Sequence, residues 1–374
     1  MCTIPQKMSG RGSGQEFSAN ERKRYRKGAC GTGIGGQVMA NIGIIGAGSW
    51  GIALAVLLHK NGHKITVWSI LQDEIAMLEK EHEHKDKLPG VKLPKDMVFT
   101  TDLEGAVKGK DVLVMAVPSP FTRSTAHSMG EYVDEGQIIV NVAKGIEEKS
   151  LSTLSQIIEE EIPKAKVAVL SGPSHAEEVG RGIPTTIVVG AKEKETAEYL
   201  QNIFMNEVFR VYISPDVLGI ELGAALKNVV ALAAGIADGL GYGDNTKAAL
   251  ITRGITEIAR LGTAMGGRFE TFCGLTGIGD LIVTCASMHS RNRRAGILIG
   301  KGYTMEEAMK EVKMVVEGVY SAKAAMALAQ KYQVEIPIIE QVNAVLFEGK
   351  EAGAAVKELM IRDKKLENSD IPWG

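Results

Sequence analysis

The chain has 374 residues, of which 45% are hydrophobic and 24% are charged, and its formal net charge is −2. This length favours two or three domains, and this composition is ordinary for a soluble globular protein with a sizeable core. A charge balance near neutrality gives no reason to expect nucleic acid or a membrane surface as the main partner. The four cysteines form no CxxC pair, so we expect a reducing, cytoplasmic compartment rather than a disulfide framework or structural zinc.

Residues 1–39 are rich in glycine, serine and charge, and they contain seven basic and two acidic residues. They show no apolar periodicity, so we expect a disordered basic extension, with a basic docking arm as the alternative. The segment has no apolar stretch before a cleavage site, which argues against a secretory signal. No uninterrupted apolar run approaches the roughly 18 residues that span a bilayer, so we expect no stable membrane insertion.

From Ala40 onward, short apolar strands alternate with helices. A strand at Asn41–Ile45, a helix at Ile52–Lys60 and a strand at Lys64–Ser69 form a βαβ unit. The alternation predicts an α/β fold with an N-terminal doubly wound, Rossmann-type sheet over residues 40–215. Later strands are expected at Val112–Val117, Ile138–Val142, Val167–Leu170, Thr186–Gly190 and Val208–Ile213, with helices such as Leu151–Glu161 and Lys194–Asn202 between them.

After residue 215 the strand signals stop, and apolar residues recur with the period of a helix. The change predicts a C-terminal all-helical domain over residues 216–374. No long linker separates the two domains, so we expect a shared interface with the ligand site between them. The expected helices are Val217–Leu240, Asn245–Met265, Arg293–Gly300, Thr304–Val312, Ser321–Lys331 and Pro337–Glu348.

The sequence GAGSWG at residues 46–51 lies between the first strand and the first helix. In this context Gly46 allows a tight turn, Gly48 lets the backbone approach a pyrophosphate, and Gly51 allows close packing of helix on sheet. The helix N-terminus offers N–H groups to that pyrophosphate, which predicts NAD or NADP as the cofactor. The tip of the second strand, around Ile70, has neither a carboxylate that would repel a 2′-phosphate nor an arginine that would bind one. The choice between NAD and NADP therefore stays open.

Two later strands end in residues suited to a ligand. Lys144 follows the strand at Ile138–Val142, at the edge where a doubly wound sheet binds its ligands. Ser171–Ala176 follow the next strand and offer hydroxyl and backbone N–H groups at the same edge. We expect His175 to pack or cap rather than catalyse, because nothing pairs it with a nucleophile.

Lys227 lies in a helix that is apolar almost all round, and such helices are buried. A buried lysine is costly unless it is partnered or functional, and desolvation moves its pKa toward the range of a general acid or base. We therefore favour a catalytic role over the alternative, a lysine that extends to the surface.

Asp280 follows the glycine-rich turn at residues 277–279 and is either a helix N-cap or the partner that orients a catalytic lysine. Ser290, Arg291 and Asn292 open the next helix, where a hydroxyl, a guanidinium and a helix N-terminus suit a phosphomonoester. A solvated basic turn is the alternative there. No metal site is expected: the histidines at positions 82 and 84 would face different ways in a solvated helix end.

Several motifs occur together in one order, and in that order they resemble the bacterial NAD(P)-dependent glycerol-3-phosphate dehydrogenases. The resemblance runs from about Ala40 to Met360 and implies reversible interconversion of dihydroxyacetone phosphate and sn-glycerol 3-phosphate, which feeds glycerophospholipid synthesis. The motifs are GAGSWG at residues 46–51, VPS at 117–119, AKG at 143–145, SGPS at 171–174, LKN at 226–228, GIGD at 277–280, SRNRR at 290–294 and VEG at 316–318.

The same resemblance implies that Lys227 donates and accepts the proton, with Asp280 and Lys144 beside it. Family members often have a basic or polar residue where Ile70 stands, so the handling of the adenosine ribose stays open. Besides Gly46, Gly48 and Gly51, cofactor contacts are implied at Ser49, Trp50, Lys144, Ala176, Arg291, Val315 and Glu317. Substrate contacts are implied at Lys144, Gly172, Ser174, Lys227, Asp280, Ser290, Arg291 and Asn292.

Two other functions stay open. A dehydrogenase with the same two-domain plan could act on a hydroxy acid or a sugar nucleotide, although the turn at Ser290–Arg294 argues for a phosphate. A non-catalytic regulator that senses the cofactor is the second alternative, and the presence of both Lys227 and Asp280 argues against it. The expected partner is a small phosphorylated ketone, and the sequence leaves a homodimer open.

Overall fold

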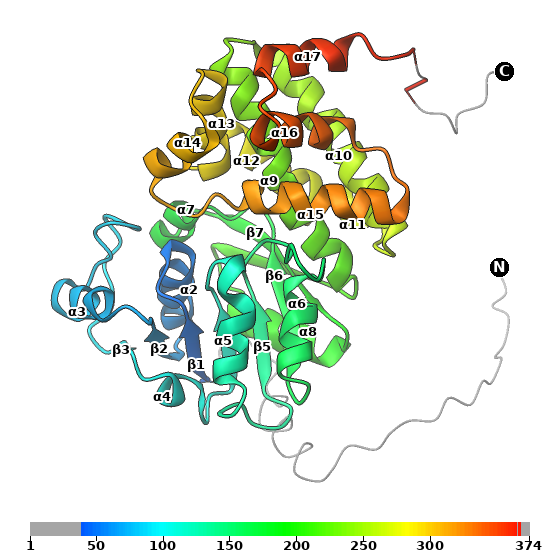
Figure 1. Ribbon diagram of the computed structural model, residues 1–374. Helices are drawn as coiled ribbons and strands as arrows, with labels where there is room; N and C mark the ends of the chain where they lie inside the picture. Colours follow the sequence, from blue (N-terminus) through cyan, green and yellow to red (C-terminus); the bar gives the residue numbers. More distant parts are fainter. Residues whose placement is uncertain (1–38, 365, 368–374) are drawn as a thin grey trace, which may run out of the picture. The chain divides into compact units, whose positions relative to one another are not determined.

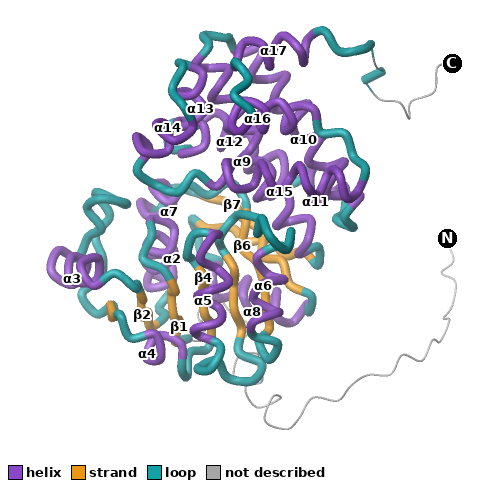
Figure 2. Tube along the Cα trace, in the orientation of Figure 1, coloured by secondary structure: helices purple, strands orange, loops and turns teal. Residues whose placement is uncertain are grey.

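A computed structural model describes residues 39–364, 366 and 367 (Figure 1). The predicted basic extension at residues 1–39 lies outside the described residues, except for Met39. The rest of the chain contains a sheet followed by a layer of helices (Figure 2), which confirms the predicted fold class.

The sheet has eight strands in the order β3-β2-β1-β4-β5-β6-β7-β8. The first six in this order are parallel and follow the strand order of a dinucleotide-binding sheet. β7 runs antiparallel to β6, and β8 is parallel to β7. The strands are β1 (Asn41–Ile45), β2 (Lys64–Trp68), β3 (Val98–Thr100), β4 (Val112–Met115), β5 (Ile138–Asn141), β6 (Lys166–Ser171), β7 (Thr185–Ala191) and β8 (Phe209–Ser214).

Helices cover both faces of the sheet, so its strands are buried on both sides. Val112 and Val114 of β4 belong to the core under one face, whereas Leu113 and Met115 belong to the core under the other. This alternation follows from the two-residue period of a strand, and it explains why the strands are continuous apolar runs. The first face is covered by α2 (Ser49–Lys60), α7 (Ala176–Arg181) and α8 (Lys194–Phe204), and the second by α4 (Leu103–Val107), α5 (Thr122–Met129) and α6 (Leu154–Glu161).

All seven strands expected from the sequence are present, but β3 was not predicted. It has only three residues and pairs at the sheet edge, where a short run gives little periodic signal. The helix α3 (Gln72–Glu81) precedes the expected helix end at positions 82–84, and the short helices α4, α5 and α7 were not predicted.

The helical part begins with α9 (Val217–Gly239), a helix of 23 residues whose residues are nearly all buried. Apolar residues of the surrounding helices form one core around it. These helices are α10 (Asp244–Ala264), α11 (Phe269–Phe272), the π-helical turn η2 (Leu275–Gly279), α12 (Asp280–Ala286), α13 (Arg291–Gly300), α14 (Met305–Val312), α15 (Glu317–Tyr332), α16 (Pro337–Phe347) and α17 (Ala352–Met360). α11 and α17 were not predicted.

Two helical stretches, Val217–Gly239 and Phe269–Ala286, are long and apolar enough to cross a membrane by length and composition alone. They contradict the expectation that no apolar stretch approaches this length. In the fold, 83% of the most apolar window of the first stretch and 39% of that of the second are buried. The first stretch is therefore the core helix of the helical part. A buried core helix is as apolar as a helix that crosses a membrane.

A buried carboxylate fixes the start of α9 to the sheet. Glu221 Oε1 accepts hydrogen bonds from Asn141 Nδ2 at 3.0 Å and from the backbone N–H of Ser155 at 2.9 Å. Asn141 ends β5 and Ser155 belongs to the first turn of α6, so one side chain joins three elements. Burial raises the pKa of Glu221, and the hydrogen bonds from Ser155 and Asn141 oppose that rise.

Candidate active site

A cleft of about 760 Å³ lies between the carboxyl ends of the parallel strands and the helical part. Two predicted site residues, Gly51 and Gly172, do not line it. The predicted site residues that do line it are Gly46, Gly48, Ser49, Trp50, Lys144, Ser174, Ala176, Lys227, Asp280, Ser290, Arg291, Asn292, Val315 and Glu317.

The glycine loop leaves one side of its backbone open. Gly46 has a φ of +117°, and a Cβ at Gly51 would lie 2.1 Å from the carbonyl oxygen of Gly46. A Cβ at Gly48, by contrast, would meet no atom within 4 Å. α2 begins at Ser49, and Gly48 provides no side-chain cap. The N–H groups of the first turn and the open side of Gly48 therefore fit a diphosphate that must approach the backbone closely.

A carboxylate from α3 reaches the end of β2, so the prediction that nothing at this tip would repel a 2′-phosphate is wrong. Glu74, from the first turn of α3, lines the cleft there together with Lys87. Glu74 Oε2 accepts a hydrogen bond from Ser69 Oγ at 2.5 Å, and its Oε1 accepts one from Lys87 Nζ. The sequence alone does not identify Glu74 as a cleft residue. Its position depends on the segment that carries Lys87, which folds back onto α3.

His84 is also placed differently from the prediction of a solvated helix end. It is 1% exposed, and its Nε2 lies 2.9 Å from Glu74 Oε1. α3 ends at Glu81, and His82 takes a left-handed conformation with φ 45° that turns the chain. His84 therefore packs inward as part of the Glu74 cluster, which consists of Ser69, Glu74, His84 and Lys87.

Two lysines share one buried carboxylate on the floor of the cleft. Lys227 Nζ lies 3.0 Å from Asp280 Oδ1, and Lys144 Nζ lies 2.6 Å from Asp280 Oδ2. Asp280 is the first residue of α12, so of the two roles considered for it the structure favours the partner of the lysines over the N-cap. Lys227 also donates to Thr284 Oγ1 at 2.6 Å, and this hydroxyl donates to the backbone oxygen of Asp280 at 2.6 Å. The cluster has two cations and one anion, which suits an oxyanion.

The electrostatics of this cluster favour proton transfer. Burial lowers the pKa of Lys227 to about 8, and the attraction of Asp280 limits the fall. Burial also acts to raise the pKa of Asp280, but the charges of Lys144 and Lys227 outweigh it and hold that pKa below its ordinary value. Asp280 is therefore an anion, while Lys227 can gain or lose a proton near neutral pH.

The N-terminus of α13 provides an unpaired guanidinium. Ser290 caps the helix, since its Oγ accepts from the backbone N–H of Arg293 at 3.2 Å. Arg291 lines the cleft, and its guanidinium has no hydrogen bond or ion pair with any residue that the structure describes. Burial lowers the pKa of Arg291, and Glu317 and Glu177 oppose the fall. A cation desolvated in this way gains from a bound anion.

Asn292 and Glu317 are already engaged within the protein. Asn292 Nδ2 donates to Asn228 Oδ1 at 3.0 Å, and its Oδ1 accepts from the backbone N–H of Gly318 at 2.8 Å. Glu317 accepts hydrogen bonds from both the backbone N–H and the hydroxyl of Ser119. These bonds join α9, α13 and α15 to the loop after β4.

Close backbone contact keeps α13 in register with α9. A Cβ at Gly235 of α9 would lie 2.2 Å from the carbonyl oxygen of Arg293, and a Cβ at Gly296 of α13 would lie 2.3 Å from that of Leu232. Only glycine allows this approach. The contact fixes the distance between Lys227 on one helix and Arg291 on the other.

His175 packs against a second histidine at the cleft. Its ring centroid lies 5.7 Å from that of His289, and its Nε2 is buried without a hydrogen-bond partner among the described residues. Burial lowers the pKa of His175, and the charge of Lys227 adds to the fall. A packing role agrees with the prediction.

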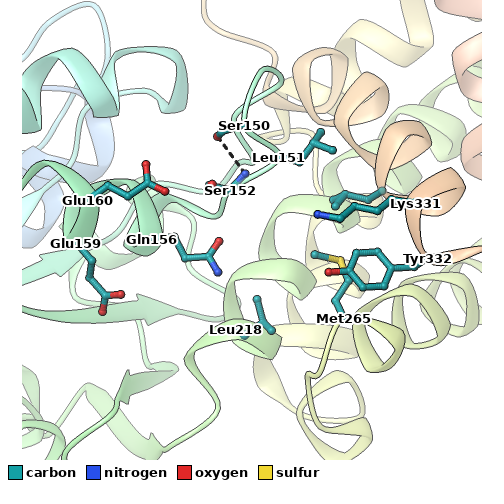
Figure 3. Close-up of a pocket in the computed structure, with 11 residues that line it drawn as sticks. Ser150, Leu151, Ser152, Gln156, Glu159, Glu160, Leu218, Met265, Lys331 and Tyr332 are labelled. Atoms are coloured by element: carbon teal, nitrogen blue, oxygen red, sulfur yellow. Dashed lines mark hydrogen bonds between the residues drawn. The ribbon is translucent and has the colours of Figure 1, made fainter.

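A second hollow, of about 500 Å³, lies away from this cleft (Figure 3). None of the predicted site residues lines it. Figure 3 shows Glu159 and Glu160 of α6 on one side and Lys331 and Tyr332 of α15 on the other. Both carboxylates have partners, since Glu159 pairs with Lys192 at 2.6 Å and Glu160 with Arg123 at 2.9 Å. Neither carboxylate is therefore available as an unpaired charge in this hollow.

Sequence reasoning missed Thr284, Glu74 and Lys87 as cleft residues. Thr284 had a usable signal, because it stands four positions after Asp280 and so shares a face of α12 with it. Glu74 and Lys87 had no such signal in the sequence.

Comparisons with known proteins identify the family. Residues 41–197 match the family model described as NAD-dependent glycerol-3-phosphate dehydrogenase N-terminus, and residues 216–357 match the corresponding C-terminus model. A relative from Agathobacter rectalis named glycerol-3-phosphate dehydrogenase [NAD(P)+] is 68% identical over 90% of this chain and 100% of its own. A relative of the same name from Fusobacterium nucleatum is 66% identical over 88% of this chain and 99% of its own.

Among solved structures, the glycerol-3-phosphate dehydrogenase from Coxiella burnetii superposes with a TM-score of 0.84 at 36% identity. The match covers 87% of this chain and 99% of that one. Both family models and these relatives agree, and this chain belongs to the family of NAD(P)-dependent glycerol-3-phosphate dehydrogenases.

Proposed function

We propose that the chain interconverts dihydroxyacetone phosphate and sn-glycerol 3-phosphate with NAD(H) or NADP(H). The observation that carries the proposal is the buried Lys227–Asp280–Lys144 cluster in a cleft that also contains the glycine loop and Arg291. The nicotinamide of the cofactor, when bound, would supply or accept the hydride at C2 of the substrate. The protein itself binds the substrate, stabilises the charge that develops on it and transfers the proton.

Lys227 is assigned the proton transfer. As C2 of the ketone is reduced, its oxygen gains negative charge, and the Lys227 ammonium donates a proton to it. In the oxidative direction, the neutral amine accepts the proton of the C2 hydroxyl. Support comes from the pKa of Lys227, which burial lowers to about 8.

Lys144 and Asp280 are assigned supporting roles. Asp280 holds both ammonium groups, at 3.0 Å and 2.6 Å, and so fixes their separation. Lys144 adds a positive charge where the oxyanion develops, and its side chain is only 18% exposed. Its second hydrogen bond, to the carbonyl of Gly172 at 3.1 Å, restricts its side chain further.

Arg291 is assigned the substrate phosphate, with help from the first-turn N–H groups of α13. Binding the phosphate at one end of a three-carbon substrate positions C2 beside Lys227 and Lys144. Gly172 and Asn292 act indirectly in this scheme: the Gly172 carbonyl accepts from Lys144 and Ser174, and Asn292 bonds Asn228 and Gly318. Ser174 and Ser290 line the cleft and are assigned direct contacts.

The cofactor is assigned to the sheet side of the cleft. Gly46, Gly48 and the start of α2 would hold the diphosphate, and Ser49 and Trp50 would lie beside it. Ala176, Val315 and Glu317 complete the wall, and Gly51 contributes by packing α2 on the sheet rather than by contact.

The proposal has consequences for organisation and location. Residues 40–215 form the cofactor domain and 216–374 the substrate domain, with the division between the end of β8 at Ser214 and the start of α9 at Val217. The enzyme acts in the cytoplasm, where it supplies the glycerol phosphate backbone of phospholipids. A homodimer is compatible with this assignment, and neither nucleic acid nor stable membrane insertion is part of it.

A turnover assay tests the proposal directly. The full chain is supplied with dihydroxyacetone phosphate and either NADH or NADPH, and oxidation of the cofactor is followed. Unphosphorylated dihydroxyacetone, a hydroxy acid and a sugar nucleotide serve as alternative substrates. Faster turnover of one of these would favour a related dehydrogenase, and binding of cofactor without any turnover would favour a regulator.

A further inference from the structure

We propose that Glu74 contacts the adenosine ribose of the cofactor and makes NAD(H), rather than NADP(H), the preferred cofactor. The inference rests on the proposed function, since it assigns a selective residue within the cofactor cleft. In doubly wound folds the ribose lies at the carboxyl end of the second strand, where an acidic side chain bonds its hydroxyls. That strand end is Trp68, whose carbonyl accepts from the Gly46 N–H at 2.9 Å. Glu74 lines the cleft at this point.

Glu74 is held in one position by three donors from two segments. Its Oε2 accepts from Ser69 Oγ at 2.5 Å, and its Oε1 accepts from His84 Nε2 at 2.9 Å and from Lys87 Nζ. A carboxylate has about four lone-pair sites. Ser69 is the one donor to Oε2 among the described residues, so Oε2 can accept a further bond from a ribose hydroxyl. A fixed acceptor of this kind discriminates better than a mobile one.

Glu74 remains negatively charged at the pH of the cytoplasm. Burial acts to raise its pKa, but the hydrogen bonds from His84, Lys87 and Ser69 outweigh burial and lower the pKa to about 2. His84 Nδ1 accepts from the backbone N–H of Lys87 at 3.2 Å, so Nε2 carries the proton that it donates and a neutral imidazole is sufficient. Lys87 is then the single positive charge in contact with Glu74 within the described residues.

A 2′-phosphate would meet unfavourable charge at this position. It brings a charge of about −1.5 to −2 next to the Glu74 carboxylate, and it would have to compete for a lysine that already bonds Glu74. The neighbouring Ile70 and Leu71 are 76% and 55% exposed and offer no charge to a phosphate. Their apolar surface suits the adenine ring instead. The 2′-hydroxyl of NAD, by contrast, adds no charge and can donate to Glu74.

Direct binding measurements on the full-length protein test the inference. Calorimetry gives the affinities for NADH and NADPH, and for ADP-ribose and its 2′-phosphate, which report on the ribose end without catalysis. The wild-type protein should bind the unphosphorylated member of each pair roughly tenfold tighter or more. Glu74→Gln keeps the shape and removes the charge, so it should reduce this ratio to about threefold or less. Glu79→Gln makes the same change at an exposed position of α3 and should keep the wild-type ratio.

Lys87→Met provides a second variant if Glu74→Gln fails to fold. It leaves the carboxylate without its countercharge, so the preference for NADH should persist. Equal or tighter binding of NADPH by the wild-type protein would overturn the inference, as would loss of the preference in Lys87→Met or its full retention in Glu74→Gln. These outcomes leave the proposed function intact, because that function is tested by substrate turnover with either cofactor and not by the ratio of the two cofactor affinities.

Discussion

The ammonium group of Lys227 lies 3.0 Å from Asp280 Oδ1, and both side chains are buried, at 4% and 1% exposure. An isolated buried lysine would be strongly destabilising, and this carboxylate is what allows it to exist. The pairing still leaves the pKa of Lys227 at about 8. The same contact therefore stabilises the fold and keeps a transferable proton in the cleft.

Lys227→Met should lower kcat for dihydroxyacetone phosphate by about 10²–10⁴-fold, because it removes the proton donor and keeps most of the apolar side chain. Cofactor affinity should change little, since Asp280 remains paired with Lys144. Steady-state rates and cofactor titration of the folded variant measure the two effects. Lys357→Met, an exposed lysine on α17, is the matched control. Near-normal turnover in Lys227→Met would remove this residue from the mechanism.

The two directions of the reaction should depend on pH in opposite ways. Reduction requires the protonated Lys227, so its kcat should fall as pH rises through about 8, the pKa of this group. Oxidation requires the neutral amine, so its kcat should rise over the same range. In Asp280→Asn the attraction that supports the charged form is lost, and any residual activity should show both midpoints at lower pH. Midpoints that move upward would contradict this account of the cluster.

Arg291→Ala should weaken the phosphorylated ketone far more than it disturbs the fold. A charge-assisted contact is worth about 1.5–3 kcal/mol, which corresponds to a loss of roughly tenfold to a hundredfold in kcat/KM. Unphosphorylated dihydroxyacetone gains nothing from the guanidinium, so its already low efficiency should hardly change. Arg210→Ala, at an exposed position of β8, should affect neither substrate. An equal loss for both substrates in Arg291→Ala would assign the residue to the cofactor or the fold.

Gly296→Ala should reduce both stability and activity without touching the substrate. The added methyl group would lie 2.3 Å from the carbonyl oxygen of Leu232, so α13 must move away from α9 at a cost of about 1–3 kcal/mol. That movement separates Arg291 from Lys227, and kcat/KM should fall with the melting temperature. Gly243→Ala, whose Cβ would meet no atom within 4 Å, is the control. Full activity in Gly296→Ala would show that the spacing of the two helices is not critical.

Much of the fold follows from local sequence patterns. Strands buried on both faces are continuous apolar runs, and this is why β1, β4 and β5 could be located. The three-residue β3 and the short helices α4 and α5 are stabilised by packing on the sheet, and a single-sequence pattern contains too little of that information. The antiparallel direction of β7 also depends on the tertiary structure.

The candidate site divides in the same way. Lys227 was identifiable because a lysine in a helix that is apolar almost all round is a local anomaly. The sequence left two roles open for Asp280, a helix N-cap or the partner of a lysine. The choice depends on which helices pack together in the fold. Glu74 was not identifiable, because its position at the end of β2 depends on the loop that carries His84 and Lys87.

The length of α9 has a consequence for how the chain unfolds. Val217 and Ile220 pack on Val169 and Val188 of the sheet, whereas Leu232 and Ile236 of the same helix belong to the core of the helical part. A continuous helix that contributes to both cores couples them, so loss of either exposes apolar surface of the other. Calorimetry should therefore find one cooperative melting transition rather than two. A fragment that ends at residue 215 should be a poor autonomous folder, because it lacks the turns that cover Val169 and Val188.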